Sequence, residues 1–408
     1  MKRYTLILLS SLFTFLATIS LFNLIIDPYA ATDWVKLDGI NAHKTRAQED
    51  GRRVTVSHQI LKRPETSLII GSSRVVDGFG ETMDHWPGGL YNAGIRGSNA
   101  YELAHIVALA KQKKDLRCLV IGVDISEFSS GEKFKSAFLL SRFPDGSQWL
   151  SLGRIMLSPY TLTRAVQTLG DNIRGTAPKP PFQDVYETGK QRARFTNSVK
   201  GVMQSHQSLT VSQERIDYLF KALDVLAERG VQIIGYLHPI HAWYEEPSFQ
   251  AGQEEASLQL RKTLLSHFQM LSEKHDPKAP CTPDEEASLW DFSGFQPPST
   301  TSIPTKLQTK SHDYFHEPAH YLPRLGNVIL PVMQGKSKHQ ASFGVKLTPQ
   351  TIDISTEQIN VRRAAYMKTV EGQQLDKIIQ SLSPRPEPIN AQALTQDDWD
   401  NLARLLKK

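Results

Sequence analysis

The amino-acid sequence predicts an α/β fold built on a doubly wound, mostly parallel β-sheet. Short apolar runs without polar alternation recur along the chain, which is typical of strands that are buried on both faces. Helical patterns separate these runs and would supply the crossover connections that a parallel sheet needs. The chain also begins with an apolar segment long enough to cross a membrane.

Five apolar runs are predicted as the strands of this sheet. Each is bounded by glycine or polar residues, and the second breaks early into a Gly-rich loop. The predicted strands are Ser67–Gly71, Leu90–Gly97, Arg117–Gly122, Val231–Leu237 and Ala287–Phe292.

Amphipathic patterns predict the helices that connect and follow the strands. The clearest is Ser212–Arg229, where Ile216, Leu219 and Leu223 share one face and Gly230 ends the helix. The other predicted helices are Ala100–Lys111, Glu254–Glu273, Leu322–Met333, Thr356–Leu382 and Asp397–Leu406.

Composition divides the chain into four parts. They are an N-terminal transmembrane anchor (1–27), a polar and basic juxtamembrane linker (28–64), the α/β domain (65–343) and a helical C-terminal appendage (344–408) with the Pro-rich stretch Ser383–Pro388. Within the α/β domain, residues from about 130 to 210 have short helical patterns and recurrent turn residues. We expect this part to be an insertion on one side of the sheet that forms or covers a cleft.

The N-terminal segment Tyr4–Ile26 holds no charged residue and could span a hydrocarbon core about 30 Å thick. Lys2 and Arg3 precede it, which favours an N-terminus left in the cytoplasm. A cleaved signal peptide is the alternative, but Pro28 stands where a small residue is wanted before a cleavage site. We therefore expect a single-pass anchor in the cytoplasmic (inner) membrane, with the main domain on the extracytoplasmic, periplasmic side.

Net charge and cysteine content exclude few classes of function. The net charge of +5 is small and its basic residues are scattered without an aromatic stripe, so we expect no nucleic-acid partner. Cys118 lies in an apolar run and is expected to be a buried small side chain, while Cys281 lies in a polar loop. An oxidising compartment would permit a disulfide between them, but the sequence does not demand one.

Hydroxyl groups follow the first predicted strand at once, in the stretch Gly71-Ser72-Ser73. A serine on a sharp strand-to-helix turn exposes its hydroxyl at the edge of the sheet, as a nucleophile requires. The other reading is that Ser72 or Ser73 caps the next helix. Loops after the other strands carry polar residues too, and in a doubly wound sheet such loops converge on one crevice.

Four blocks in order carry a resemblance to a known family: Gly71-Ser72-Ser73, Asn92-x-Gly94-x-x-Gly97, Gly122-Val123-Asp124, and an acid-x-x-His near the C-terminal side. Together they resemble the SGNH (GDSL) hydrolase superfamily over residues 64–335. With the N-terminal anchor, the chain is similar to the membrane-tethered DltD-like and alginate O-acetylation (AlgJ/AlgX-like) branch. The resemblance implies a flavodoxin-like three-layer sheet.

By position in the motif, the resemblance makes Ser73 the nucleophile. It places the oxyanion site at the backbone N–H groups of Ser73 and Gly97 and at the third block, next to Asp124. The family has an asparagine in that third block, whereas this sequence has Val123.

Two registers of acid-x-x-His fit the general base and the carboxylate that orients it. We favour His320 with Glu317, because Tyr321 and then Gly326 follow as in the tethered branch. The alternative register is His316 with Asp313.

Other polar residues at strand ends are candidates for substrate binding. They are Arg74, Asn92, His238 and His241. Arg74 could instead pair with Asp77 or Asp124, and His238-Pro239-Ile240-His241 could be an ordinary turn. Histidines at 312, 316 and 320 have a spacing that zinc sites use, but Pro318 interrupts a helix there, so we expect no metal and no cofactor.

The expected function is that of a membrane-anchored serine acyltransferase or esterase acting on a cell-envelope glycan or polymer. The resemblance implies a multi-span membrane acyltransferase as the partner that supplies the acyl group. The alternative is a non-catalytic scaffold or glycan-binding component of an envelope complex, which the missing asparagine of the third block favours.

Overall fold

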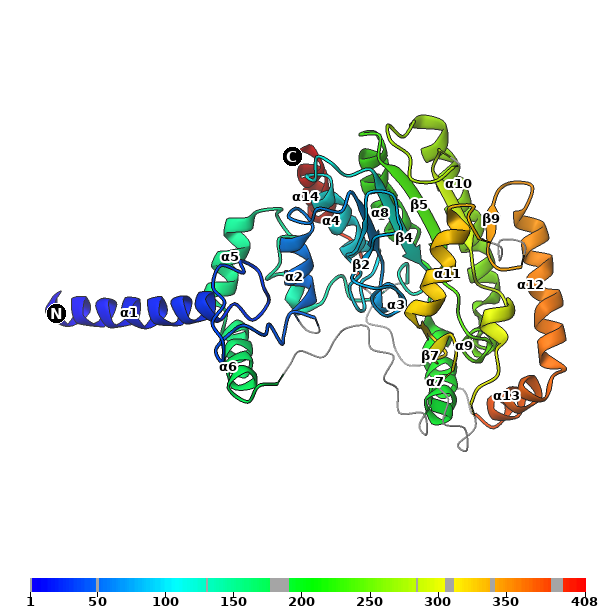
Figure 1. The fold of residues 1–408 in the computed structure, drawn as a ribbon, viewed down its shortest axis with the longest axis horizontal. Coiled ribbons are helices and arrows are strands. Elements are labelled where there is room, and N and C mark those ends of the chain that lie inside the picture. Colours follow the sequence, from blue (N-terminus) through cyan, green and yellow to red (C-terminus); the bar gives the residue numbers. More distant parts are fainter. Residues whose placement is uncertain are drawn as a thin grey trace.

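The computed structural model describes residues 2–48, 51–129, 131–176, 191–283, 285–304, 312–337, 342–382 and 392–408. Within them, a seven-stranded sheet has the order β2-β3-β1-β4-β5-β6-β9 (Figure 1). Its five inner strands are parallel, and the edge strands β2 and β9 are antiparallel to their neighbours. The strands are β1 Ser67–Ile70, β2 Thr82–Met83, β3 Leu90–Asn92, β4 Cys118–Val123, β5 Gln232–Leu237, β6 Ser288–Asp291 and β9 Val345–Leu347. The predicted α/β class with a mostly parallel sheet is confirmed.

The order of the parallel strands locates the functional edge of the sheet. Numbered along the chain, they lie in the order 2-1-3-4-5, so the winding direction reverses between β1 and β4. These two strands pair directly, from Ser67 opposite Cys118 to Ile70 opposite Ile121. Ligand crevices in such sheets form beyond the carboxyl ends of the strands at the reversal. The loops that begin at Gly71 and Asp124 both open at this point.

Helices cover both faces of the sheet. Successive side chains along a strand point to opposite faces, so each strand contributes to two apolar cores. In β1, Leu68 and Ile70 join one core and Ile69 joins the other. The first face carries α4 Ala100–Ala110, α8 Gln213–Ala227, α10 Glu254–Lys274 and α14 Gln396–Lys407. The second face carries α3 Ser73–Gly78, α7 Gln191–Ser205, α9 Ala242–Ser248, α11 Pro323–Met333, α12 Ile352–Met367 and α13 Val370–Gln380.

The N-terminal helix α1 (Lys2–Ile26) leaves the body at one side (Figure 1). Among the described residues it is the one helix long and apolar enough to cross a membrane, a property that signal sequences share. Its last turns pack against α5 (Gln148–Leu157) and α6 (Pro159–Ile173). Asn23 is buried there, and its side-chain amide donates to the Met156 carbonyl at 2.9 Å.

The segment 28–64, predicted as a polar and basic juxtamembrane linker, is packed against the body of the domain. It contains the helix α2 (Arg52–Gln59), whose two leading arginines are buried in the body. Arg53 forms an ion pair with Glu102 of α4 at 2.8 Å. Arg52 donates to the Asn92 carbonyl at 2.8 Å. The sequence could not show that these two arginines are buried, because their partners lie on a strand and a helix that are distant along the chain.

The C-terminal part, predicted as a helical appendage, packs on the domain and also contributes a strand to its sheet. Strand β9 extends the sheet beside β6, and Leu402 and Leu405 of α14 belong to the core. The predicted helix Thr356–Leu382 is two helices, α12 and α13. Thr369 separates them and caps α13, its hydroxyl accepting the Gly372 N–H at 3.1 Å. The Pro-rich stretch 383–388 lies outside the described residues.

In its described residues, the stretch predicted as an insertion contains the helices α5, α6 and α7 (Gln191–Ser205) and two short 3₁₀ turns, Ser136–Phe138 and His206–Ser208. Helices α5 and α6 pack on α1, whereas α7 lies on the second face beside α9 and α13. Ser198 of α7 lines the cleft described below. The predicted turn Gly175–Gln183 lies mostly outside the described residues.

Cys118 and Cys281 form a disulfide bond. Cys118 opens β4 and Cys281 lies in the loop before β6, so the bond connects the middle of the sheet to a segment 163 residues away in sequence. Cys118 is buried, as its apolar surroundings predicted, and the pairing with Cys281 that the sequence left open is formed.

Candidate active site

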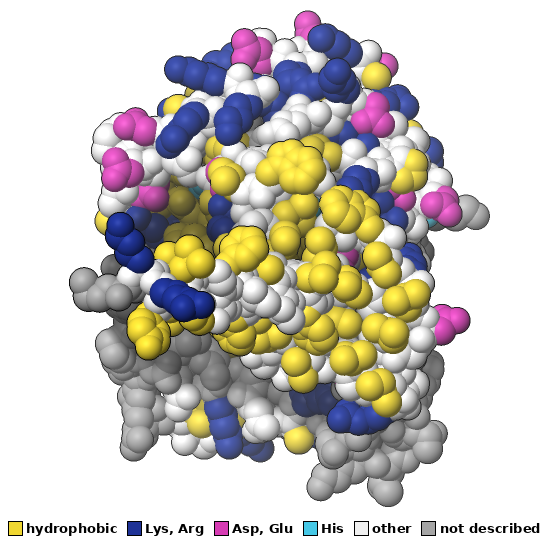
Figure 2. Space-filling view, turned by 90° about the vertical axis from the view of Figure 1, so that its left-hand side faces the viewer, with side chains coloured by type: hydrophobic (Ala, Val, Ile, Leu, Met, Phe, Trp, Pro, Cys, Tyr) yellow, Lys and Arg dark blue, Asp and Glu magenta, His cyan; other side chains and the backbone are white. Residues whose placement is uncertain are grey.

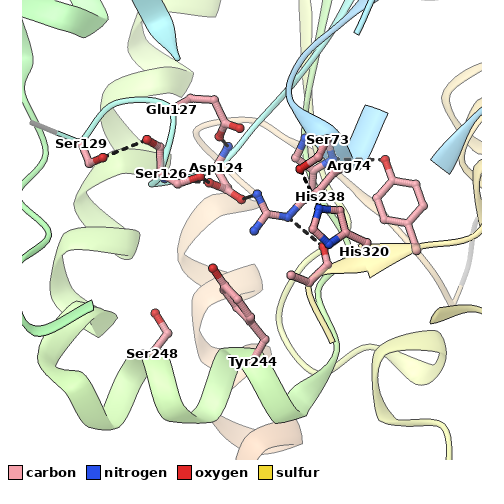
Figure 3. A network of polar contacts seen from close by, with 12 residues as sticks. Ser73, Arg74, Asp124, Ser126, Glu127, Ser129, His238, Tyr244, Ser248 and His320 are labelled. Carbon is pink, nitrogen blue, oxygen red and sulfur yellow. Dashed lines mark hydrogen bonds and ion pairs between the residues drawn. The ribbon is translucent and has the colours of Figure 1, made fainter. Parts of the chain in front are cut away.

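The hydroxyl of Ser73 and the imidazole of His320 meet across two loops that are distant in sequence (Figure 3). Ser73 Oγ lies 2.6 Å from His320 Nε2. The other ring nitrogen, Nδ1, contacts the carboxylate of Glu317. A hydroxyl, an imidazole and a carboxylate in this order are the parts of a serine nucleophile activated by a general base.

A sharp turn at Gly71 presents the Ser73 hydroxyl. Gly71 has a φ of 152°, a conformation that side chains rarely adopt, and a Cβ there would stand 2.7 Å from the Gly122 carbonyl of the neighbouring strand. The chain therefore leaves β1 and enters α3 within two residues. Ser72 occupies the N-cap position with no side-chain capping bond, and Ser73 is the first residue of α3.

A hairpin of two short strands holds the histidine and its carboxylate together. Strands β7 (Phe315–Glu317) and β8 (His320–Tyr321) are antiparallel, and Glu317 pairs directly with His320. Directly opposed side chains on such a pair are in contact distance. The Ala319 N–H also donates to Glu317 at 3.2 Å, which orients the carboxylate.

The environment of Glu317 favours its ionised form. Burial alone would raise its pKa, but the hydrogen bond and charge of His320 outweigh burial and hold the pKa of Glu317 below its ordinary value. An ionised Glu317 accepts the Nδ1–H of His320, which leaves Nε2 with a lone pair facing the serine. The proton of Ser73 thus has an acceptor.

The alternative pair, His316 and Asp313, is arranged differently. His316 lines the same cleft with its ring centroid 5.7 Å from that of His320, and burial lowers its pKa to about 4. Asp313 is half-exposed and lies 4.0 Å from the guanidinium of Arg324. The structure brings Ser73 together with His320 and Glu317.

Arg74 joins the loops that form the site (Figure 3). Its guanidinium is buried, forms an ion pair with Asp124 after β4, and donates from Nε to the Ala319 carbonyl at 3.0 Å. It also lies over the ring of Tyr244, 5.6 Å from the centroid. Arg74 was expected to bind substrate or to pair with a carboxylate. Although it lines the cleft, its contacts make it a positioning residue.

Asp124 and Glu127 form a buried acidic pair in which the pKa of one carboxyl is lowered and the pKa of the other is raised. Burial opposes ionisation of Asp124, but the Arg74 guanidinium outweighs it and holds the Asp124 pKa well below its usual range. Burial and then the charge of Asp124 raise the pKa of Glu127 well above its ordinary value. Glu127 accepts the Asp124 N–H at 2.7 Å. That backbone donor is therefore directed at Glu127, which argues against the oxyanion role expected for it.

A polar cleft of about 770 Å³ surrounds Ser73 and His320. Gly97, which was predicted to supply an oxyanion donor, lies in its lining. Further residues line the cleft that no sequence motif predicted, namely Arg96, Glu127, Lys135, Ser198 and Tyr244. Glu127 follows a strand end by only a few residues, which could have indicated it. Ser198 and Tyr244 come from helices whose patterns carry no such signal.

Three residues predicted to bind substrate are buried behind the site. Asn92 donates to the carbonyls of Val75 and Phe79 at 2.9 and 3.2 Å, so it holds α3 against β3. His238 contacts the Tyr321 hydroxyl at 3.1 Å, and His241 contacts the Thr301 carbonyl at 2.9 Å. Substrate binding by these residues stays a prediction. Each side chain makes an internal hydrogen bond in the structure, since a polar residue at a strand end can face inward to bond the loops.

The histidines with a metal-like spacing have other partners. His312 accepts the backbone N–H groups of Tyr314 and Phe315 at its Nδ1, while His320 faces Ser73. Across the described part of the chain, no group of three histidine, cysteine or acidic side chains has a geometry suited to a metal ion.

No known family model matches this chain, and no curated protein shows significant similarity to it.

Proposed function

We propose that this protein is a membrane-anchored, extracytoplasmic serine acyltransferase or esterase of SGNH type that acts on a cell-envelope glycan or polymer. The contact between Ser73 Oγ and His320 Nε2 at 2.6 Å, with Glu317 behind the ring, carries the proposal. The strand order and the position of Ser73 after β1 also support it, because nucleophiles and ligands occupy this crevice in related architectures.

The proposed reaction begins when Ser73 Oγ attacks the acyl carbonyl and passes its proton to His320 Nε2. Glu317 stabilises the resulting imidazolium through Nδ1, and backbone N–H groups of Ser73 and Gly97 would stabilise the oxyanion. The tetrahedral intermediate then expels the donor's leaving group, which takes the proton from His320. An acyl-Ser73 ester remains.

In the second half of the reaction, His320 removes a proton from the acceptor hydroxyl, whose oxygen attacks the acyl carbonyl. The tetrahedral intermediate then breaks its bond to Ser73 Oγ, and His320 returns the proton to that oxygen. A sugar hydroxyl as acceptor makes the protein a transferase, whereas water makes it an esterase. The polar lining of the cleft suits a hydroxyl-rich acceptor. In the transferase, a multi-span membrane partner would supply the acyl group.

Two features of the chain support a retained anchor with the domain outside the cytoplasm. The last turn of α1 is bound to the body, since Asn41 and Lys44 donate to the Ile25 and Ile26 carbonyls. The Cys118–Cys281 disulfide fits an oxidising compartment. The N-terminal peptide of the membrane-extracted protein, identified by mass spectrometry, distinguishes a retained α1 from a cleaved signal sequence.

A serine-directed fluorophosphonate probe tests the proposed chemistry on the full chain in detergent. Wild type and Ser72→Ala are expected to be labelled, and Ser73→Ala is not. Turnover of p-nitrophenyl acetate with and without a sugar acceptor then separates transferase from esterase.

One observation favours the non-catalytic alternative, a scaffold or glycan-binding component of an envelope complex. The Asp124 N–H is bonded to the Glu127 carboxylate, so this donor of the third block is already occupied and is not free to bind an oxyanion. Wild-type protein that remains unlabelled, yet binds an envelope glycan, would support this alternative over the enzyme.

A further inference from the structure

Large apolar side chains of α5 and α6 are exposed, and these two helices pack against the last turns of α1. Figure 2 shows hydrophobic side chains gathered on this side of the molecule, from which α1 projects. We define the apolar platform as Trp149, Leu150 and Leu157 of α5 with Tyr160, Val166 and Ile173 of α6. Their exposed fractions lie between 39% and 74%, which is unusual for so many large apolar side chains in one place. The opposite faces of both helices are packed inward through residues such as Leu152, Ile155 and Ala165.

The length of α1 indicates what covers this platform. The helix is exposed on all sides only from its start to Thr18, and from Ile19 onward it becomes partly buried against the body. The stretch Tyr4–Thr18 measures about 22 Å at about 1.5 Å per residue. A hydrocarbon core of about 30 Å requires about 20 residues, which would extend from Tyr4 to Asn23.

A bilayer spanned by α1 therefore reaches the turn of α1 that is packed on the body. Asn23 lies at this level and is bonded to the Met156 carbonyl of α5. Helix α6 begins three residues further on, and both helices contact α1. The platform must then stand at the boundary between headgroups and hydrocarbon, where exposed apolar side chains are stabilised by burial in lipid.

The residue types on and beside the platform fit this boundary. Trp149 and Tyr160 are the side chains that membrane interfaces favour, because one end is apolar and the other polar. Arg164 lies over the Tyr160 ring, 4.9 Å from its centroid, and Arg174 ends α6 with a largely exposed side chain. Basic side chains at this height are attracted to anionic lipid headgroups.

We propose that α5 and α6 form an interfacial membrane-binding platform whose apolar side chains insert into the outer leaflet around α1. The bilayer thus holds the domain by a spanning helix together with a surface, which limits its tilt and sets the height of the cleft above the lipid. This inference rests on the proposed membrane anchoring by α1.

Fluorescence of single NBD-labelled cysteines tests the platform in the full chain. The two native cysteines are paired, so an introduced thiol is the labelling site. We would label Trp149→Cys and Val166→Cys on the platform, Leu9→Cys in the anchor and Gln259→Cys on the distant helix α10, each exposed. The protein would be placed as one copy per nanodisc of phosphatidylethanolamine and phosphatidylglycerol, with or without nitroxide-labelled lipid.

The platform predicts that labels at 149, 166 and 9 lose most of their emission to the nitroxide lipid, while the label at 259 does not. Labels at 149 and 166 that behave like 259, with 9 quenched, would overturn the platform and leave the anchor intact. If the label at 9 is not quenched either, both the platform and the membrane anchoring by α1 would be overturned. If the labels at 149 and 166 instead report an apolar surrounding that the nitroxide lipid does not quench, and only in nanodiscs that hold two copies, a second copy of the chain covers the platform. This result would also overturn the proposal.

Discussion

Arg74 donates a hydrogen bond from Nε to the carbonyl oxygen of Ala319 at 3.0 Å, which ties the residue after the nucleophile to the hairpin that carries the base. The same guanidinium pairs with the carboxylate of Asp124 after β4. One buried side chain thus connects three loops that the sheet brings to its edge. The distance between Ser73 and His320 depends on this connection.

We expect Arg74→Met to destabilise the protein and to abolish probe labelling of Ser73. The substitution leaves Asp124 buried without its partner, and breaking a buried pair in this way costs about 3–5 kcal/mol. Denaturant unfolding monitored by circular dichroism measures the change. Lys262→Met is the control, since its ion pair with Asp353 is exposed on both sides and is expected to be worth at most about 1 kcal/mol. Equal losses for both variants would contradict the role given to Arg74.

Glu317→Gln is expected to lower the rate of Ser73 labelling and turnover by about 10³–10⁴-fold while the fold is retained. The amide no longer stabilises the imidazolium and can favour the wrong tautomer of His320. Asp313→Asn serves as the control and should leave the rate near that of wild type. A larger loss in Asp313→Asn than in Glu317→Gln would instead assign the base to His316.

Glu127 is expected to make the protein less stable as pH rises. Its pKa is raised in the folded state by burial and by Asp124, so above the unfolded value of about 4.3 the folded protein retains a proton that the unfolded chain has lost. This contribution is fully present below about pH 4 and disappears as pH rises through the folded pKa of Glu127.

Thermal unfolding from pH 5 to 9 measures this dependence, and Glu127→Gln should flatten it. Asp124 affects the stability in a separate pH range, because its pKa is lowered in the folded state. Its contribution to stability is lost only at pH below the unfolded value of about 3.9. An unchanged slope in Glu127→Gln would show that Glu127 is ionised in the folded protein.

Removing the disulfide by Cys118→Ser with Cys281→Ser is expected to lower the free energy of unfolding by about 2–5 kcal/mol. The bond closes a long loop, with a sequence separation of 163, and both cysteines are buried. Wild type treated with reductant should approach the double variant, and the double variant should not respond to reductant. Alkylation of both cysteines in native, non-reduced protein would show that the pair is not formed.

The sequence alone was sufficient for the elements whose signals are local. Continuous apolar runs predicted β1, β4, β5 and β6, and amphipathic spacing predicted α4, α8, α10 and α11, because buried strands and helices impose their own periodicity. The stretch Gly71-Ser72-Ser73 stood out as a turn from a strand into a helix. The acid-x-x-His came from the family resemblance, which favoured Glu317 with His320 and left Asp313 with His316 open. From these, the sequence indicated a serine and a histidine at the same edge of a sheet.

Only the tertiary structure decided which polar groups face the cleft and which face the interior. Asn92, His238 and His241 looked like ligands but complete internal hydrogen bonds, whereas Glu127 and Tyr244 reach the cleft without any motif. Arg52 and Arg53 looked like a solvated charge run, yet they are buried with partners that the fold brings from other elements. A side chain's direction depends on what packs around it, and contacts between segments far apart in the chain have no periodic signal in the sequence.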